Sequence, residues 1–151
     1  AEINILLSDL LNLLNAEIKQ HGIEVELNLI SPPPRLAFDP GQLRQAILNI
    51  VINSREALIN GGKISVTTRT NTNYTEIEVA DNGPGIPKEV RGRIFEPFFS
   101  TKPNGTGLGL SLTQEIVQGH GGEIEVRENS PSGTSIIVRL PQSSNQHAIA
   151  V

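Results

Sequence analysis

The sequence contains no cysteine, no methionine and no tryptophan. Without cysteine there can be no disulfide, no thiolate metal site and no cysteine nucleophile, and the composition fits a reducing cytoplasm. Methionine is missing even at position 1, so we expect a fragment of a longer protein. No apolar run is long enough to cross a membrane, because polar residues interrupt the stretch 3–14. We therefore expect a cytoplasmic domain that is not itself membrane-inserted, although its parent protein could be membrane-anchored.

Basic residues are also scarce. Lysine and arginine together number 12, against 16 aspartates and glutamates, which leaves a net charge of −4. Nucleic-acid-binding domains usually carry a basic patch, so this balance argues against nucleic acid as a partner. The 151 residues, 37% of them hydrophobic, suffice for one domain with a packed core.

The spacing of apolar residues predicts four helices and five strands. Asp39-Pro40 is a typical helix start, and Gly22 is a plausible helix stop. The proline-rich segment 31–34 fits either a surface loop, which we favour, or a rigid linker. The predicted helices are 2–20, 40–58, 88–94 and 108–119, and the predicted strands are 24–30, 63–70, 74–80, 123–128 and 134–140.

Two pairs of these strands are separated only by short turns, at 63–80 and at 123–140. Hairpins are antiparallel, whereas a doubly wound parallel sheet needs a helix between every pair of strands. We therefore predict a two-layer α/β sandwich, with helices on one face of a mixed, mostly antiparallel sheet. Residues 1–141 would form this domain, and the polar residues 142–151 would be a disordered tail.

Three segments carry residues suited to chemistry. Asn49 and Asn53 share one face of the predicted helix 40–58, as either a solvated stripe or a pair of ligands. Asp81 ends a strand and is followed by glycines that let a ligand approach the backbone, unless it only forms a turn. Residues 104–110 open a helix, where N–H groups bared by glycine suit phosphates. This last segment matches neither a Walker A loop nor a dinucleotide fingerprint.

Together and in this order, these segments resemble the sequence boxes of bacterial sensor histidine kinases. The paired asparagines and residues 81–85, 95–99 and 105–110 are similar to the asparagine, first glycine, phenylalanine and second glycine boxes. Residues 133–135 look like the last glycine-threonine element. The resemblance covers about residues 2–141. It implies the superfamily of gyrase, heat-shock chaperone and histidine kinase ATPases, whose Bergerat fold is the sandwich predicted above.

The resemblance also implies roles for individual residues that bind ATP and magnesium. Asp81 would accept a hydrogen bond from the adenine amino group, Asn53 would supply an oxygen ligand to Mg²⁺, and Asn49 would lie near the phosphates. Lys102 would contact the γ-phosphate, unless it is a solvated surface lysine. The other residues implied to contact or shape the nucleotide site are Gly83, Gly85, Ile86, Gly105, Thr106, Gly107, Leu108, Gly109 and Thr134.

The sequence departs from the family pattern beside the second asparagine. Many members place a lysine or arginine three residues after it, where this chain has Glu56. The neighbouring Arg55 points about 100° away on a helix. The segment 96–102, with its short predicted lid at about 97–107, looks like the branch of nitrogen-regulatory kinases.

The resemblance implies the catalytic half of a histidine kinase. Its partners would be a histidine-containing dimerisation domain of the same parent protein and, downstream, a response regulator. None of the three histidines, His21, His120 and His147, is followed by the acid that family phosphoacceptor sites usually carry. An autonomous ATPase or anti-sigma-type serine kinase is disfavoured, because such relatives place a glutamate base where Asn49 stands. A non-enzymatic nucleotide-sensing module stays open.

Overall fold

The structure, a computed structural model, describes residues 2–34, 36–97 and 109–142. This part of the chain contains four helices and five strands, with β2 followed directly by β3 and β4 by β5. Their bounds are α1 Ile3–Gln20, β1 Ile23–Asn28, α2 Pro40–Ala57, β2 Gly62–Thr70, β3 Tyr74–Asp81, α3 Lys88–Arg91, α4 Gly109–Gly119, β4 Glu123–Glu128 and β5 Thr134–Pro141. None of the described helices is long and apolar enough to span a membrane.

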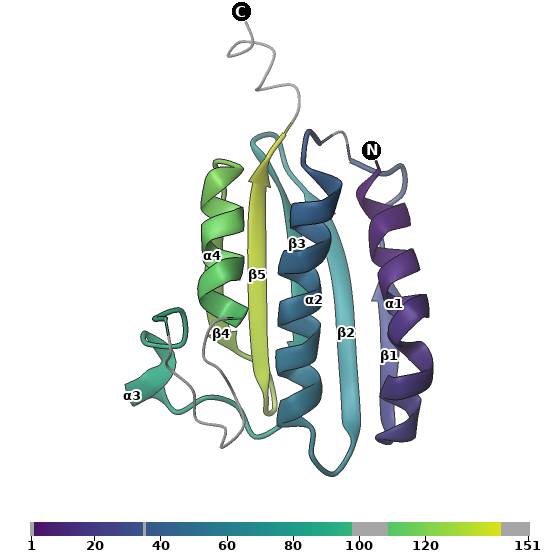
Figure 1. The fold of residues 1–151 in the computed structure, drawn as a ribbon, viewed down its shortest axis with the longest axis vertical. Coiled ribbons are helices and arrows are strands. Elements are labelled where there is room, and N and C mark those ends of the chain that lie inside the picture. Colours follow the sequence, from purple (N-terminus) through teal and green to yellow (C-terminus); the bar gives the residue numbers. More distant parts are fainter. Residues whose placement is uncertain (1, 35, 98–108, 143–151) are drawn as a thin grey trace, which may run out of the picture.

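The strands form one mixed sheet in the order β1-β2-β3-β5-β4. β1 pairs with β2 in parallel, and the other three pairings are antiparallel. α1, α2 and α4 lie side by side over one face of the sheet (Figure 1). The predicted two-layer sandwich is therefore confirmed, including both hairpins.

The core lies between this helical layer and the sheet. One face of α2, with Ile47, Ile50 and Val51, is buried and packs against strand residues such as Ile64, Ile77 and Ile136. Because β-strand side chains alternate, the opposite face of the sheet is polar and carries ion pairs such as that between Arg69 and Glu78.

The predicted start of α2 and the predicted end of α1 have the capping residues that the sequence indicated. Asp39 is the N-cap of α2, and its Oδ1 accepts a hydrogen bond from the Gln42 amide at 2.9 Å. Gly22 follows α1 with φ +73°, a conformation that glycine adopts without strain. Strand β1 ends at Asn28, two residues before the prediction, because the Ile30 amide turns to donate to the Thr68 hydroxyl at 2.8 Å.

A histidine links the far ends of the two helices that carry the sequence boxes. His120 follows α4; its Nδ1 donates to the Ile116 carbonyl at 2.8 Å, and its Nε2 accepts from the Asp39 amide at 3.0 Å. Nδ1 thus acts as the donor of the ring and Nε2 as its acceptor. His120 therefore serves a structural contact between the end of α4 and the start of α2.

Candidate nucleotide-binding site

Asp81 is a buried acid at the end of β3. Its side chain is only 3% exposed, and its Oδ1 accepts from the Gly83 amide at 3.0 Å and from the Thr134 amide at 3.3 Å. Asp81 and Thr134 are 53 residues apart in the chain and meet because β3 and β5 are neighbours in the sheet. Two residues that the family resemblance assigned to the nucleotide site are thus joined by a hydrogen bond.

Glycines allow the two loops around Asp81 to touch through their backbones. Gly133 has φ +109°, and a Cβ on it would lie 1.9 Å from the Asp81 carbonyl oxygen. Gly85 has φ +83°, and a Cβ there would lie 3.2 Å from the Gly133 carbonyl oxygen. A side chain at Gly83 would press on the Asp81 carboxylate at 3.2 Å. Gly133 and Gly85 are therefore required by their positive φ and by the close approach of backbone, whereas a side chain at Gly83 would need the Asp81 carboxylate to shift.

Two asparagines hold this loop in place, and the sequence did not reveal their roles. Asn82 Oδ1 accepts from the Lys63 amide at 2.8 Å, which ties the loop to β2. Asn129 Nδ2 donates to the Asp81 carbonyl at 2.8 Å from the turn that precedes β5. In the sequence, Asn129 only signals a turn before a Ser-Pro pair, so its partner could not be read from the pattern.

The paired asparagines of α2 are half-buried, so Asn49 does not belong to a solvated stripe. Asn49 Nδ2 donates to the Gly109 carbonyl at 3.1 Å, across 60 residues of sequence. This contact brings the asparagine helix against the start of α4, where the second glycine box ends. Asn53 lies one turn further along α2, towards the C-terminal end of the helix. Leu58 follows that end and lies beside Gly83, which in turn lies beside the Asp81 carboxylate.

Arg55 is directed away from this side of the helix. Its guanidinium pairs with the Glu17 carboxylate on α1. The Arg55 side chain thus fastens α1 to α2, as its predicted helical angle suggests. Glu56, at the position where many family members carry a lysine or arginine, is exposed.

The predicted site is only partly covered by the described residues. Ile86 is half-buried next to Gly85, and Gly109 is the first residue of α4. The other predicted phosphate contacts, namely Lys102, Gly105, Thr106, Gly107 and Leu108, lie outside the described residues, as do nearly all of the predicted lid and the tail from residue 143.

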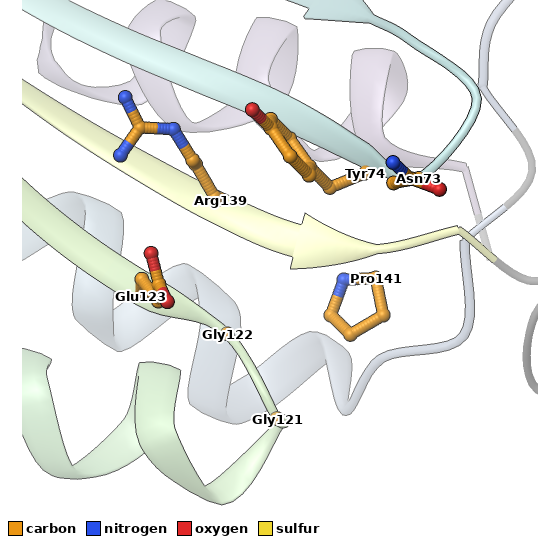
Figure 2. A pocket seen from close by; sticks show the side chains of 7 residues that line it. All are labelled: Asn73, Tyr74, Gly121, Gly122, Glu123, Arg139 and Pro141. Carbon is orange, nitrogen blue, oxygen red and sulfur yellow. The ribbon is translucent and has the colours of Figure 1, made fainter.

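A separate cavity of about 420 Å³ lies at the opposite end of the sheet (Figure 2). Tyr74 and Arg139 line it, and β3 places Tyr74 about 23 Å from Asp81, at roughly 3.3 Å per residue. Arg139 pairs with Glu76 at 2.8 Å and with Glu125 at 2.7 Å, and hydrogen bonding to Glu125 raises the pKa of its guanidinium. Because these acids balance its charge, the cavity does not resemble an anion site.

The model of the family described as histidine kinase-, DNA gyrase B-, and HSP90-like ATPase matches residues 38–144. The chain belongs to this family. Sporulation kinase E of Bacillus subtilis is 35% identical over 141 residues, which cover 93% of this chain and 19% of that protein. The sensory histidine kinase/phosphatase NtrB of Vibrio alginolyticus is 37% identical over 134 residues, covering 81% of this chain and 38% of that protein.

Solved structures of a histidine kinase show the same fold. The catalytic domain of ThkA superposes with a TM-score of 0.85 at 32% identity, covering 93% of this chain and 95% of that domain. ThkA in complex with the response regulator protein TrrA matches with a TM-score of 0.83 at 29% identity, covering 97% of this chain and 42% of that one. The chain thus corresponds to the catalytic domain and spans about a fifth to two fifths of the curated relatives cited above.

Proposed function

We propose that this domain binds ATP with magnesium and presents the γ-phosphate to a histidine on a separate dimerisation domain of a two-component sensor kinase. The observation that carries the proposal is the buried Asp81 carboxylate, held by the amides of Gly83 and Thr134. A carboxylate is an acceptor only, which suits the amino group of adenine. We further propose, as the family resemblance implies, that Gly83 and Gly85 let the backbone close on the base.

The phosphates would extend from this adenine site towards the start of α4. Asn49 lies there, bonded to Gly109, and a helix start offers unpaired N–H groups to anions. Lys102 and residues 105–108 immediately precede this helix in the sequence, and we propose that they complete the phosphate site. The protein would then act by positioning the γ-phosphate and balancing its charge.

Asn53 fits a magnesium site of the kind that the family implies. Its amide oxygen is a hard ligand, and the described residues contain no cluster of three acids or histidines that would bind a cation by themselves. Such a site depends on phosphate oxygens and waters for its remaining ligands. When bound, magnesium would offset the phosphate charge.

We propose that a second protein domain supplies the nucleophile, because no histidine of this chain is followed by the acid of family phosphoacceptor sites; His147 itself lies outside the described residues. His21 and His120 both use Nδ1 to bond a carbonyl within their own helix, and Nε2 of His120 is taken by Asp39. A histidine on the dimerisation domain would attack the γ-phosphorus, the bond to the bridging oxygen would break, and ADP would leave. The complex of ThkA with TrrA supports a response regulator as the next acceptor.

An autonomous ATPase or serine kinase fits the site less well. Asn49 occupies the position where such relatives carry a glutamate base, and its Nδ2 is a donor to the Gly109 carbonyl. An amide takes no proton at neutral pH and so provides no general base for water or a hydroxyl. A nucleotide sensor without catalysis would bind ATP in the test below but would leave the dimerisation domain unlabelled.

Two experiments test the proposal. Calorimetry should show saturable binding of ATP with magnesium. After incubation with labelled ATP, the domain alone should acquire no acid-labile label, whereas a dimerisation domain from the same parent protein should be labelled on its histidine when the two are mixed. Absence of binding would overturn the proposal; label on this chain alone, or rapid phosphate release that needs Asn49, would favour an autonomous enzyme.

Replacing Asn53 with alanine should separate the metal site from the adenine site. We expect the affinity for ATP with magnesium to fall about tenfold or more, which is roughly the 1.5 kcal/mol that a charge-assisted contact contributes. The affinity for adenosine should change less than twofold, since the residue lies away from the base. Calorimetry with both ligands measures this; equal losses for the two, or an unchanged magnesium dependence, would contradict the assignment.

A further inference from the structure

The amide of Asn49 has a defined orientation. Gln45 lies one turn earlier on α2, and its Nε2 donates to Asn49 Oδ1 at 3.0 Å. With that oxygen occupied by a donor, the other end of the amide, Nδ2, points to the Gly109 carbonyl at 3.1 Å. Each end of the Asn49 side chain therefore meets a group of complementary polarity.

The Gly109 carbonyl is also fixed from a second direction. Thr113 is fully buried, and its hydroxyl lies 3.0 Å from the Gly109 carbonyl oxygen and 3.3 Å from that of Ala46 on α2. α2 and α4 are thus joined by polar contacts at the point where α4 begins. The Gly109 carbonyl is therefore held in place. The orientation of the Asn49 amide then decides whether Asn49 presents an N–H group or an oxygen at the start of α4.

We propose that Gln45 is a positioning residue that, together with the Gly109 carbonyl, sets which end of the Asn49 amide faces the phosphates. The inference rests on the proposed function, which places the phosphates at the start of α4. With Gln45 as donor, Asn49 presents an N–H group towards that region. If the amide turned over, its oxygen would face both the Gly109 carbonyl and the phosphate charge, and both contacts would be repulsive.

Gln45→Glu reverses the polarity of this contact with almost no change in shape. A carboxylate only accepts, so the Asn49 amide should turn to donate to it. Gln45→Met removes the donor without replacing it, and because position 45 is exposed, water can solvate Asn49 Oδ1 instead. Glutamine, glutamate and methionine have similar helix propensities, so α2 should persist in both variants.

Calorimetry on the whole chain with an ATP analogue and with adenosine tests the proposal. Gln45→Glu should weaken the analogue about tenfold, Gln45→Met less than threefold, and neither should change adenosine affinity by more than twofold. Gln42→Glu places the same charge three residues earlier on the same helix and serves as the matched control. A loss no larger than that of the control would overturn the proposal.

A double-mutant cycle separates orientation from the added negative charge. In an Asn49→Ala background there is no amide to turn, so Gln45→Glu should lose most of its effect on the analogue. An undiminished tenfold loss in that background would show that Gln45 acts by charge alone and would overturn the inference. If the parent domain binds adenosine and ATP and both Gln45 variants bind them equally well, this inference is overturned but the proposed function is not.

Discussion

Asp81→Asn should weaken ATP binding by about 10- to 100-fold. Asp81 Oδ1 accepts hydrogen bonds from the amides of Gly83 and Thr134. An asparagine can keep these hydrogen bonds only if its Oδ1 occupies the position of the Asp81 Oδ1. Its Nδ2 would then face the adenine amino group, donor against donor. A hydrogen bond to a charged group contributes roughly 1.5–3 kcal/mol, which corresponds to this range of affinities.

Calorimetry with ATP and adenosine measures this effect, and both ligands should lose affinity equally because they share the base. Asp39→Asn is the matched control: it makes the same chemical change at the cap of α2, where asparagine caps as well as aspartate. The control should bind ATP like the parent. An unchanged affinity in Asp81→Asn would remove this residue from the nucleotide site.

Gly133→Ala should destabilise the domain by about 2–6 kcal/mol. The backbone at this residue has φ +109°, where a side chain is strained by roughly 1–3 kcal/mol. The new Cβ would also lie 1.9 Å from the Asp81 carbonyl oxygen, and relief of such overpacking costs another ~1–3 kcal/mol. The loop that carries Asp81 must move away, so nucleotide binding should be lost together with stability.

Urea unfolding of this variant beside Gly119→Ala measures the difference. Gly119 closes α4, and a Cβ there meets nothing within 4 Å, so alanine should leave stability unchanged or raise it by up to about 1 kcal/mol. A midpoint for Gly133→Ala that equals that of the parent would show that the two loops do not need to touch. If Gly133→Ala does not accumulate as folded protein while Gly119→Ala folds like the parent, the result agrees with the expectation.

Local patterns determined a large part of the molecule. Ile47, Ile50 and Val51 have the spacing of one helical face, which is buried in the structure, and Asp39-Pro40 located the start of α2 at the observed residue. The two hairpins, with no room for a helix inside either, predicted an antiparallel-rich sheet. These properties depend on residues that are close in the chain, so they can be read directly from the order of amino acids.

Tertiary structure decided which of these groups meet. Asp81 contacts Thr134 only because β3 and β5 are adjacent in the sheet, and Asn49 contacts Gly109 only because α4 packs along α2. The supporting roles of Asn129 and His120 likewise depend on partners 48 and 81 residues away. The sequence by itself determined the elements and the residues suited to a nucleotide. Sheet order and helix packing, which sum many weak contacts over the whole chain, determined the hydrogen bonds that orient those residues.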